Sequence, residues 1–139
     1  MLFVDLDGFK QINDDHGHDA GDRLLAEAGR RIASCVRATD TVTRFGGDEF
    51  VVVLEDLESR TAVPHLVRMI GERLSAPADP GEAASGIGAS IGVALYPDDG
   101  DTLAALLRAA DAAMYAIKKT RTCRPAAVAG MPPQVDSRA

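Results

Sequence analysis

Arg44-Phe45-Gly46-Gly47-Asp48-Glu49-Phe50 is the stretch that decides the fold. The run Thr41 to Thr43, rich in β-branched residues, leads into the glycine pair, and the apolar run Val51 to Leu54 leaves it. Two β-forming runs on either side of a glycine turn are typical of a β-hairpin. We therefore predict two strands joined by a tight turn, with Asp48 and Glu49 at that turn.

The turn has two interpretations. Gly46 and Gly47 let a backbone approach a ligand closely, and neighbouring carboxylates at a strand end can hold Mg²⁺ while leaving coordination sites for substrate phosphates. An ordinary charged hairpin on the protein surface uses the same residue types. The heptapeptide alone does not choose between these interpretations, so the rest of the chain has to.

Size and charge limit the classes of protein to consider. The 139 residues, 46% of them hydrophobic and 26% charged, are typical of one globular domain. The net charge of −6 disfavours a nucleic-acid binder and a protein anchored on anionic membranes, because both use a basic face. A phosphorylated ligand would therefore need metal ions. No apolar run reaches transmembrane length and the first residues do not form a signal peptide, so we expect no membrane insertion and a cytoplasmic location.

Hydrophobic periodicity predicts the remaining elements. A strand runs over Met1 to Val4 and ends in Asp5-Leu6-Asp7, where Asp7 is placed to cap a short turn over residues 8–12. Residues 13–22 are dense in turn-forming side chains and predict a loop with helix caps. The later elements are a helix over about 19–38, a helix over 63–74, a strand over 87–95 whose small-residue face allows close packing, and a last helix capped by Thr102.

Without the last helix, the order β-α-β-β-α-β is that of the ferredoxin-like split βαβ fold. We therefore predict an α+β domain with a central antiparallel sheet flanked by helices, and an extra C-terminal helix. In that fold the first and third strands lie side by side, which brings Asp5 next to Asp48. Two acids from distant parts of the chain become a candidate metal pair, and two metals about 3.5–4 Å apart would clamp the attacking and leaving oxygens of a phosphoryl displacement.

Two polar side chains near the first strand suggest that a base is bound. Asn13 and Asp22 supply an amide and a carboxylate, and the carboxylate can accept hydrogen bonds from N1 and N2 of a guanine. Turn formation and helix capping account for most of the residues around them.

Five separated stretches carry a resemblance to a known family. They are Asp5 to Asp14, Gly17 to Asp22, Arg44 to Phe50, Ser90 to Ala94, and Ala110 to Tyr115. With these motifs in this order, the chain resembles a GGDEF domain, which is the catalytic module of bacterial diguanylate cyclases. The resemblance extends from Leu2 to about Lys119. The resemblance implies a nucleotidyl-cyclase palm, a homodimer that presents one GTP and two Mg²⁺ (or Mn²⁺) per subunit, and conversion of two GTP into cyclic di-GMP and two pyrophosphates.

The resemblance also implies roles for single residues. The side chains of Asp5 and Asp48 and the carbonyl of Leu6 would hold the metals. Glu49 would be the second essential acid, acting on the metals or on the attacking 3′-hydroxyl. The residues that would contact the nucleotide are Gly46 and Gly47 for close approach, Asn13 and Asp22 for the guanine, and Phe9, Lys10 and Lys118, with the two lysines at the phosphates.

Arg37 and Asp40 lie at the family's spacing for a product-inhibition site that binds cyclic di-GMP, which Arg68 or Arg73 would complete. This pair supports a second hypothesis, a non-catalytic module that binds GTP or serves as a cyclic di-GMP receptor. A third hypothesis is another nucleotidyl cyclase or polymerase palm on the same fold. Asn13 with Asp22 favours guanine as the base, which a comparison of GTP with ATP would test.

The chain departs from the family pattern at both ends. GGDEF domains continue upstream for about one more helix, so we predict a domain over residues 1–122 that lacks its first helix, exposes apolar surface there, and is normally joined to an upstream sensor. After Lys118 the family usually has Gly-Arg-Asn, whereas the aligned residues here are Arg121, Thr122 and Cys123. The phosphate contact of the family's arginine would therefore need Arg121 to substitute from the neighbouring position. Residues 123–139 are predicted to be a disordered tail.

Overall fold

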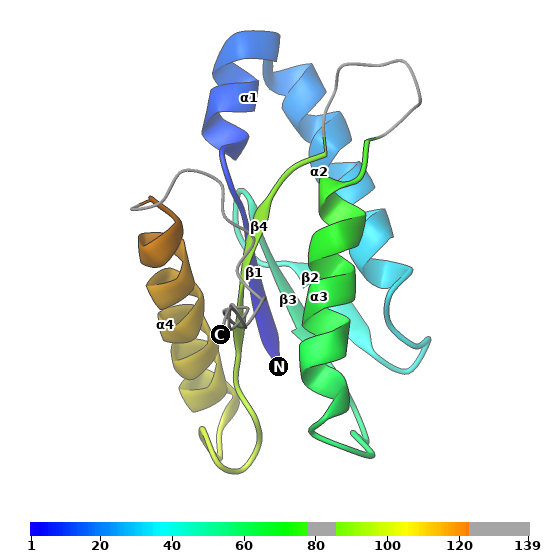
Figure 1. Cartoon of the computed structure of the whole chain (residues 1–139), viewed down its shortest axis with the longest axis vertical. Helices are drawn as coiled ribbons and strands as arrows, with labels where there is room; N and C mark the ends of the chain where they lie inside the picture. The colour runs from blue at the N-terminus through cyan, green and yellow to red at the C-terminus, as the bar shows by residue number, and fades with distance from the viewer. Residues whose placement is uncertain (78–85, 123–139) are drawn as a thin grey trace, which may run out of the picture.

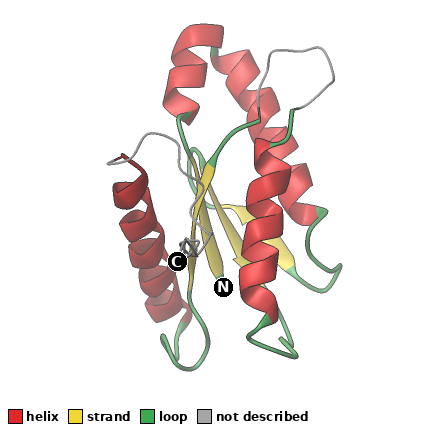
Figure 2. Ribbon diagram, viewed as in Figure 1, coloured by secondary structure: helices red, strands yellow, loops and turns green. Residues whose placement is uncertain are grey.

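The structure is a computed structural model that describes residues 1–77 and 86–122 (Figures 1 and 2). The predicted tail over 123–139 lies outside the described residues. The elements in chain order are β1 (Leu2–Leu6), α1 (Phe9–His16), α2 (His18–Ala33), β2 (Thr41–Arg44), β3 (Glu49–Val53), α3 (Ala62–Ser75), β4 (Ala89–Val93) and α4 (Leu103–Thr122). The strands form one antiparallel sheet in the order β2-β3-β1-β4. The predicted α+β class and the central pairing of β1 with β3 are confirmed.

Strand alternation gives the sheet two faces with different cover. On one face Leu2, Val4 and Leu6 of β1 form the main core with residues of α2 and α3. On the other face Phe3 and Val51 pack with residues of α4. Figure 1 shows α4 on one side of the strands and α3 on the other. Each fully buried aliphatic side chain of this kind stabilises the fold by about 1.5–3 kcal/mol.

The predicted small-residue face of β4 is the surface on which α4 packs. A Cβ added at Gly92 would lie 2.0 Å from the carbonyl oxygen of Ala110 and 2.4 Å from the nitrogen of Met114, so only glycine allows this approach. The predicted cap is also present, because Thr102 Oγ1 accepts a hydrogen bond from the N–H of Ala105 at 3.1 Å. The position of α4 is therefore set by β4 and by its own first turn.

The loop predicted over residues 13–22 is wrong. α1 continues to His16 and α2 starts at His18, so only Gly17 separates the two helices. Its φ of 87° is in the left-handed region that favours glycine. Phe9 and Ile12 pack against the core, and this anchoring outweighs the turn preference of the Asn and Asp residues between the helices.

Two further predictions of local structure are wrong. Asp7 does not cap α1, because the residue before α1 is Gly8, with φ 75°, and no side chain caps the helix. The helix predicted to reach about residue 38 ends at Ala33. Beyond it, Asp40 Oδ2 accepts a hydrogen bond from the N–H of Arg37 at 2.8 Å, which closes a turn in place of further helix.

Aromatic side chains are exposed on the α4 side of the sheet. Phe45 is 56% exposed and its ring meets Phe3 edge-on, while Tyr115 of α4 is 58% exposed. That an upstream helix would cover apolar surface of this domain stays a prediction. Within residues 1–77 and 86–122, no helix is both long and apolar enough to cross a membrane.

Candidate active site

The end of β1 lies beside the β2–β3 hairpin. Asp5 is the register partner of Glu49 in β3 and of Ser90 in β4. The N–H of Leu6 donates to the carbonyl of Asp48 at 3.0 Å. The predicted neighbourhood of Asp5 and Asp48 is therefore confirmed, and it follows from strand order alone.

Backbone hydrogen bonds close the hairpin around its second acid. The N–H groups of Phe45 and Gly46 both donate to the carbonyl of Glu49, at 2.8 and 3.3 Å. A Cβ added at Gly46 would lie 2.4 Å from Glu49 Oε2, whereas one at Gly47 would meet nothing within 4 Å. The first glycine therefore makes room for the Glu49 carboxylate, and the second leaves open space beside it. Close approach of a nucleotide to this pair stays a prediction.

The carboxylates at this strand end perturb one another. Asp5 is 7% exposed, and its burial, together with the charges of Asp48 and Asp7, raises its pKa against the opposing effect of Lys118. Burial also raises the pKa of Glu49, with further contributions from Asp5, Asp48 and Asp111. Acids that raise one another's pKa in a partly buried place form a site where added positive charge is favourable.

Two cations of α4 face these acids. Lys118 Nζ donates to Asp5 Oδ1 at 2.9 Å, and this bond raises the pKa of the lysine. Arg121 Nη1 donates to Asp7 Oδ2 at 3.0 Å. Strand alternation placed Asp5 and Asp7 on one face, and their pairing with residues 118 and 121 of one helix confirms this. The predicted contact of Lys118 with a phosphate stays a prediction.

The donor set fits Mg²⁺ or Mn²⁺, which prefer hard oxygen ligands. In residues 1–77 and 86–122 no three His, Cys, Asp or Glu side chains converge closely enough to hold a metal by themselves. Mg²⁺ typically binds through one or two carboxylates and completes its shell with water and substrate phosphates. Asp5 and Asp48, with the carbonyl of Leu6, supply hard oxygen atoms at one strand end, and their mutual repulsion is what a divalent ion would relieve.

A second group of predicted residues gathers where α1 meets α2. The side chain of Asn13 lies against Gly21, since a Cβ added there would be 1.7 Å from Asn13 Oδ1 and 3.2 Å from the ring of Phe9. Asn13 Oδ1 is buried and has no hydrogen-bond partner among residues 1–77 and 86–122. Asp22 follows Gly21 and is exposed. Phe9, Asn13 and Asp22 thus share one place, with an acceptor that a ligand with N–H groups would suit.

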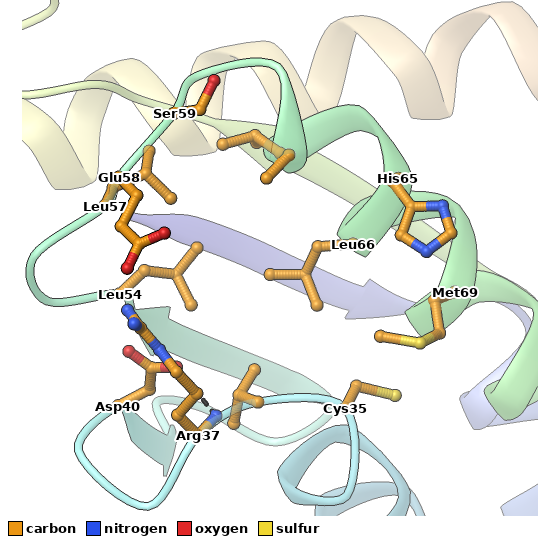
Figure 3. Close-up of a pocket in the computed structure, with 13 residues that line it drawn as sticks. Cys35, Arg37, Asp40, Leu54, Leu57, Glu58, Ser59, His65, Leu66 and Met69 are labelled. Carbon is orange, nitrogen blue, oxygen red and sulfur yellow. Dashed lines mark hydrogen bonds and ion pairs between the residues drawn. The ribbon is translucent and has the colours of Figure 1, made fainter.

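Arg37 and Asp40 lie together at a pocket of about 320 Å³ between the end of β3 and α3 (Figure 3). Asp40 is a structural residue here, because its carboxylate accepts from the N–H groups of both Arg37 and Glu55. The guanidinium of Arg37 donates to the carbonyl of Glu55 at 2.7 Å. Arg68 contacts His65, which lines the pocket, at 3.1 Å.

The sequence from residue 1 to 124 matches the family model described as diguanylate cyclase, GGDEF domain. The chain belongs to the GGDEF family. It is 49% identical over 118 residues to the bifunctional diguanylate cyclase/cyclic di-GMP phosphodiesterase MucR of Pseudomonas aeruginosa, covering 85% of this chain and 17% of that protein. It is 42% identical over 120 residues to the diguanylate cyclase TpbB of Pseudomonas aeruginosa, covering 86% of this chain and 28% of that protein. The chain therefore spans less than a third of these relatives.

Solved structures of GGDEF domains have the same fold. The GGDEF domain of TpbB from Pseudomonas aeruginosa matches with a TM-score of 0.79 at 42% identity, covering 86% of this chain and 74% of that one. The GGDEF domain of DgcB from Caulobacter crescentus, solved in complex with cyclic di-GMP, matches with a TM-score of 0.74 at 25% identity and covers 86% and 71% of the two chains.

Two residues near this site, Ser90 and Asp111, were not singled out as site residues from the sequence. Ser90 is fully buried and its hydroxyl donates to Asp7 at 2.9 Å. Asp111 adds negative charge near Glu49. A serine among the glycines and alanines of the small face was the available signal for Ser90, whereas nothing local distinguishes Asp111 from other exposed acids of a helix.

Proposed function

We propose that this GGDEF domain is a diguanylate cyclase, which condenses two GTP into cyclic di-GMP and two pyrophosphates across a homodimer with Mg²⁺, or Mn²⁺ in its place. The observation that carries this proposal is the pairing of Asp5 with Glu49 across β1 and β3, with Asp48 bonded to Leu6 beside them. This arrangement gathers hard oxygen ligands and an acid with a raised pKa at one open strand end.

Each residue has a chemical task in this proposal. Asp5, Asp48 and the carbonyl of Leu6 would hold divalent ions, which supply Lewis acidity when bound. Glu49 accepts a proton from the 3′-hydroxyl or supports a metal, and its raised pKa suits the first task. Lys118, which donates to Asp5 at 2.9 Å, would supply positive charge to the phosphates of the nucleotide.

The guanine pocket is the second part of the proposal. Asp22 accepts from N1 and N2 of the base, the amide of Asn13 makes the remaining contact, and Phe9 and Lys10 approach the nucleotide from α1. The unpartnered acceptor of Asn13 supports this role. A polymerase palm that uses all bases would have no reason for such a pair.

The test is incubation of the purified chain with GTP and Mg²⁺, followed by mass-spectrometric identification of the product. Cyclic di-GMP is the expected product, and Asp48→Ala and Glu49→Ala are expected to abolish it. Asp101→Asn, at an exposed acid outside the proposed site, is the matched control and is expected to leave product formation unchanged. No product from folded, dimeric protein would refute the proposal.

The pocket beside Arg37 supports a second function, the binding of cyclic di-GMP as an inhibitor or, without catalysis, as a signal. Arg37 lines this 320 Å³ pocket with a side chain that is 53% exposed, and such a guanidinium suits a phosphate-bearing ligand. Calorimetry with cyclic di-GMP and with GTP separates the two functions, since a pure receptor binds the first tightly and converts none of the second.

A further inference from the structure

Hydrogen bonds tie Asp7 to two elements behind the proposed metal site. Asp7 Oδ1 accepts from Ser90 Oγ of β4 at 2.9 Å, and Asp7 Oδ2 accepts from Arg121 Nη1 of α4 at 3.0 Å. The N–H of Asp7 donates to the carbonyl of Gly88 at 2.7 Å. Arg121 Nη1 also donates to the carbonyl of Ala89. Both carboxylate oxygens and the N–H of Asp7 therefore have partners outside β1.

These bonds fix the peptide group between Leu6 and Asp7. In a trans peptide the N–H and the preceding C=O point in opposite directions. Since the N–H of Asp7 points to Gly88 on the β4 side, the carbonyl of Leu6 points to the other side, toward β3 and Asp48. The N–H of Leu6 donates to Asp48 at 3.0 Å on that same side, and the Leu6 side chain is fully buried. The direction of the Leu6 carbonyl is therefore set by what holds Asp7.

The Asp7 contacts are suited to orientation more than to stability. The side chains of Arg121 and Asp7 are 46% and 30% exposed, and ion pairs this exposed contribute little to folding. Ser90 is fully buried, and Asp7 is the acceptor of its hydroxyl. Arg121 lies one position before the residue that aligns with the arginine of the family's Gly-Arg-Asn, and its guanidinium donates to Asp7 and to the carbonyl of Ala89.

We propose that Asp7, Ser90 and Arg121 form a positioning network that aims the Leu6 carbonyl at a divalent cation, and that Arg121 acts through Asp7 rather than on a phosphate. The inference rests on the proposed function in one respect, since it takes Asp5, Leu6 and Asp48 as the cation's ligands. Residues that orient metal ligands from the outer shell typically contribute about 10- to 100-fold to metal affinity.

The test is Mn²⁺ binding to the whole 139-residue chain without nucleotide, measured by the electron paramagnetic resonance signal of free Mn²⁺. Arg121→Met and Ser90→Ala are each expected to weaken binding about 10-fold. The sign is diagnostic for Arg121, because removal of a cation near a metal site strengthens metal binding by Coulomb's law alone. Arg108→Met, at an exposed position of the same helix, is the matched control and is expected to leave binding unchanged or slightly stronger.

A double variant tests whether Arg121 acts through Asp7. Arg121→Met is expected to have no further effect on Mn²⁺ binding once Asp7→Asn is present. Stronger Mn²⁺ binding by Arg121→Met, combined with a raised KM for GTP, would show a phosphate contact and overturn the proposal. Arg121→Lys serves if Arg121→Met fails to fold, and it is expected to recover part of the Mn²⁺ affinity.

The outcomes separate this inference from the proposed function. An unmodified chain that binds Mn²⁺ but makes no cyclic di-GMP refutes the cyclase, while the network still stands or falls by the variants. An unmodified chain that binds no Mn²⁺ refutes the network, because the oriented carbonyl would then have no cation to meet.

Discussion

Alanine at Gly92 tests whether close contact between β4 and α4 maintains the site. The added Cβ would lie 2.0, 2.4 and 2.9 Å from three backbone atoms of Ala110 and Met114, and all three distances are shorter than ordinary van der Waals contact, which begins at 3.4 Å. Backbone cannot rotate away as a side chain can, so α4 has to retreat by about 1 Å or more. Overpacking of this kind costs about 1–3 kcal/mol, and the backbone clash favours the upper half of that range.

The assay is thermal unfolding followed by circular dichroism. A loss of about 2–3 kcal/mol corresponds to a fall in Tm of about 6–12 °C for a chain of this length. Because α4 also carries Lys118 and Arg121, the same variant should lose cyclase activity at temperatures where it is still folded.

Gly71→Ala is the matched control because the same substitution there should have the opposite sign. Gly71 lies inside α3, and an added Cβ would meet nothing within 4 Å. Alanine in a helix interior is favoured over glycine by about 0.5–1 kcal/mol, so the Tm should rise by about 2–4 °C. An unchanged Tm for Gly92→Ala, or equal losses for the two variants, would refute the reasoning.

Three further predictions concern the acids and the base site. Glu49→Gln should raise metal-free stability at pH 7 by about 0.5 kcal/mol and abolish activity. Folding raises the pKa of Glu49 above its ordinary 4.5, so the folded state binds more protons than the unfolded state. Urea titrations at several pH values should therefore show that the unmodified chain loses stability as the pH rises from 4.5 through that raised pKa. Asp40→Ala should lower the free energy of unfolding by about 1–3 kcal/mol, because two N–H groups lose their acceptor. Arg37→Ala should lower it by under about 0.5 kcal/mol and weaken cyclic di-GMP binding in calorimetry. Equal stabilities of the two variants would contradict this. Asn13→Ala should lower kcat/KM for GTP about 100-fold with a smaller effect on kcat, and an unchanged preference for GTP over ATP would rule out its base contact.

The sheet and the acid pair could be predicted because they depend on patterns that tertiary contacts reinforce. Alternation, a glycine turn and the order of strands and helices were enough to bring Asp5 next to the hairpin, since the split βαβ fold admits one strand order. The small face of β4 predicted close packing for the same reason: glycine there has no local use in a strand.

The errors lie where local and distant partners compete for the same residue. An aspartate before a helix is a good cap, but Asp7 has partners 83 and 114 residues away, and these fix its side chain elsewhere. Residues 13–22 have the composition of a turn, yet Phe9 and Ile12 anchor one helix on the core and a single glycine suffices to start the next. No local sequence pattern predicts the distant hydrogen-bond partners of Asp7 or the packing of Phe9 and Ile12 against the core.

The cations of α4 offset the negative charge of the acids at the end of β1. Asp5 is buried, and its pKa is raised by burial and by two neighbouring acids, so without compensation this strand end would oppose folding. Lys118 supplies that compensation. Its side chain is 40% exposed, which keeps the ammonium group near water and lowers the free-energy cost of breaking its ion pair with Asp5. A fully buried lysine would stabilise the acids more firmly but would compete with the metal. The half-exposed position of Lys118 therefore suits the proposed metal site, which would have to fold without divalent ions and then bind them.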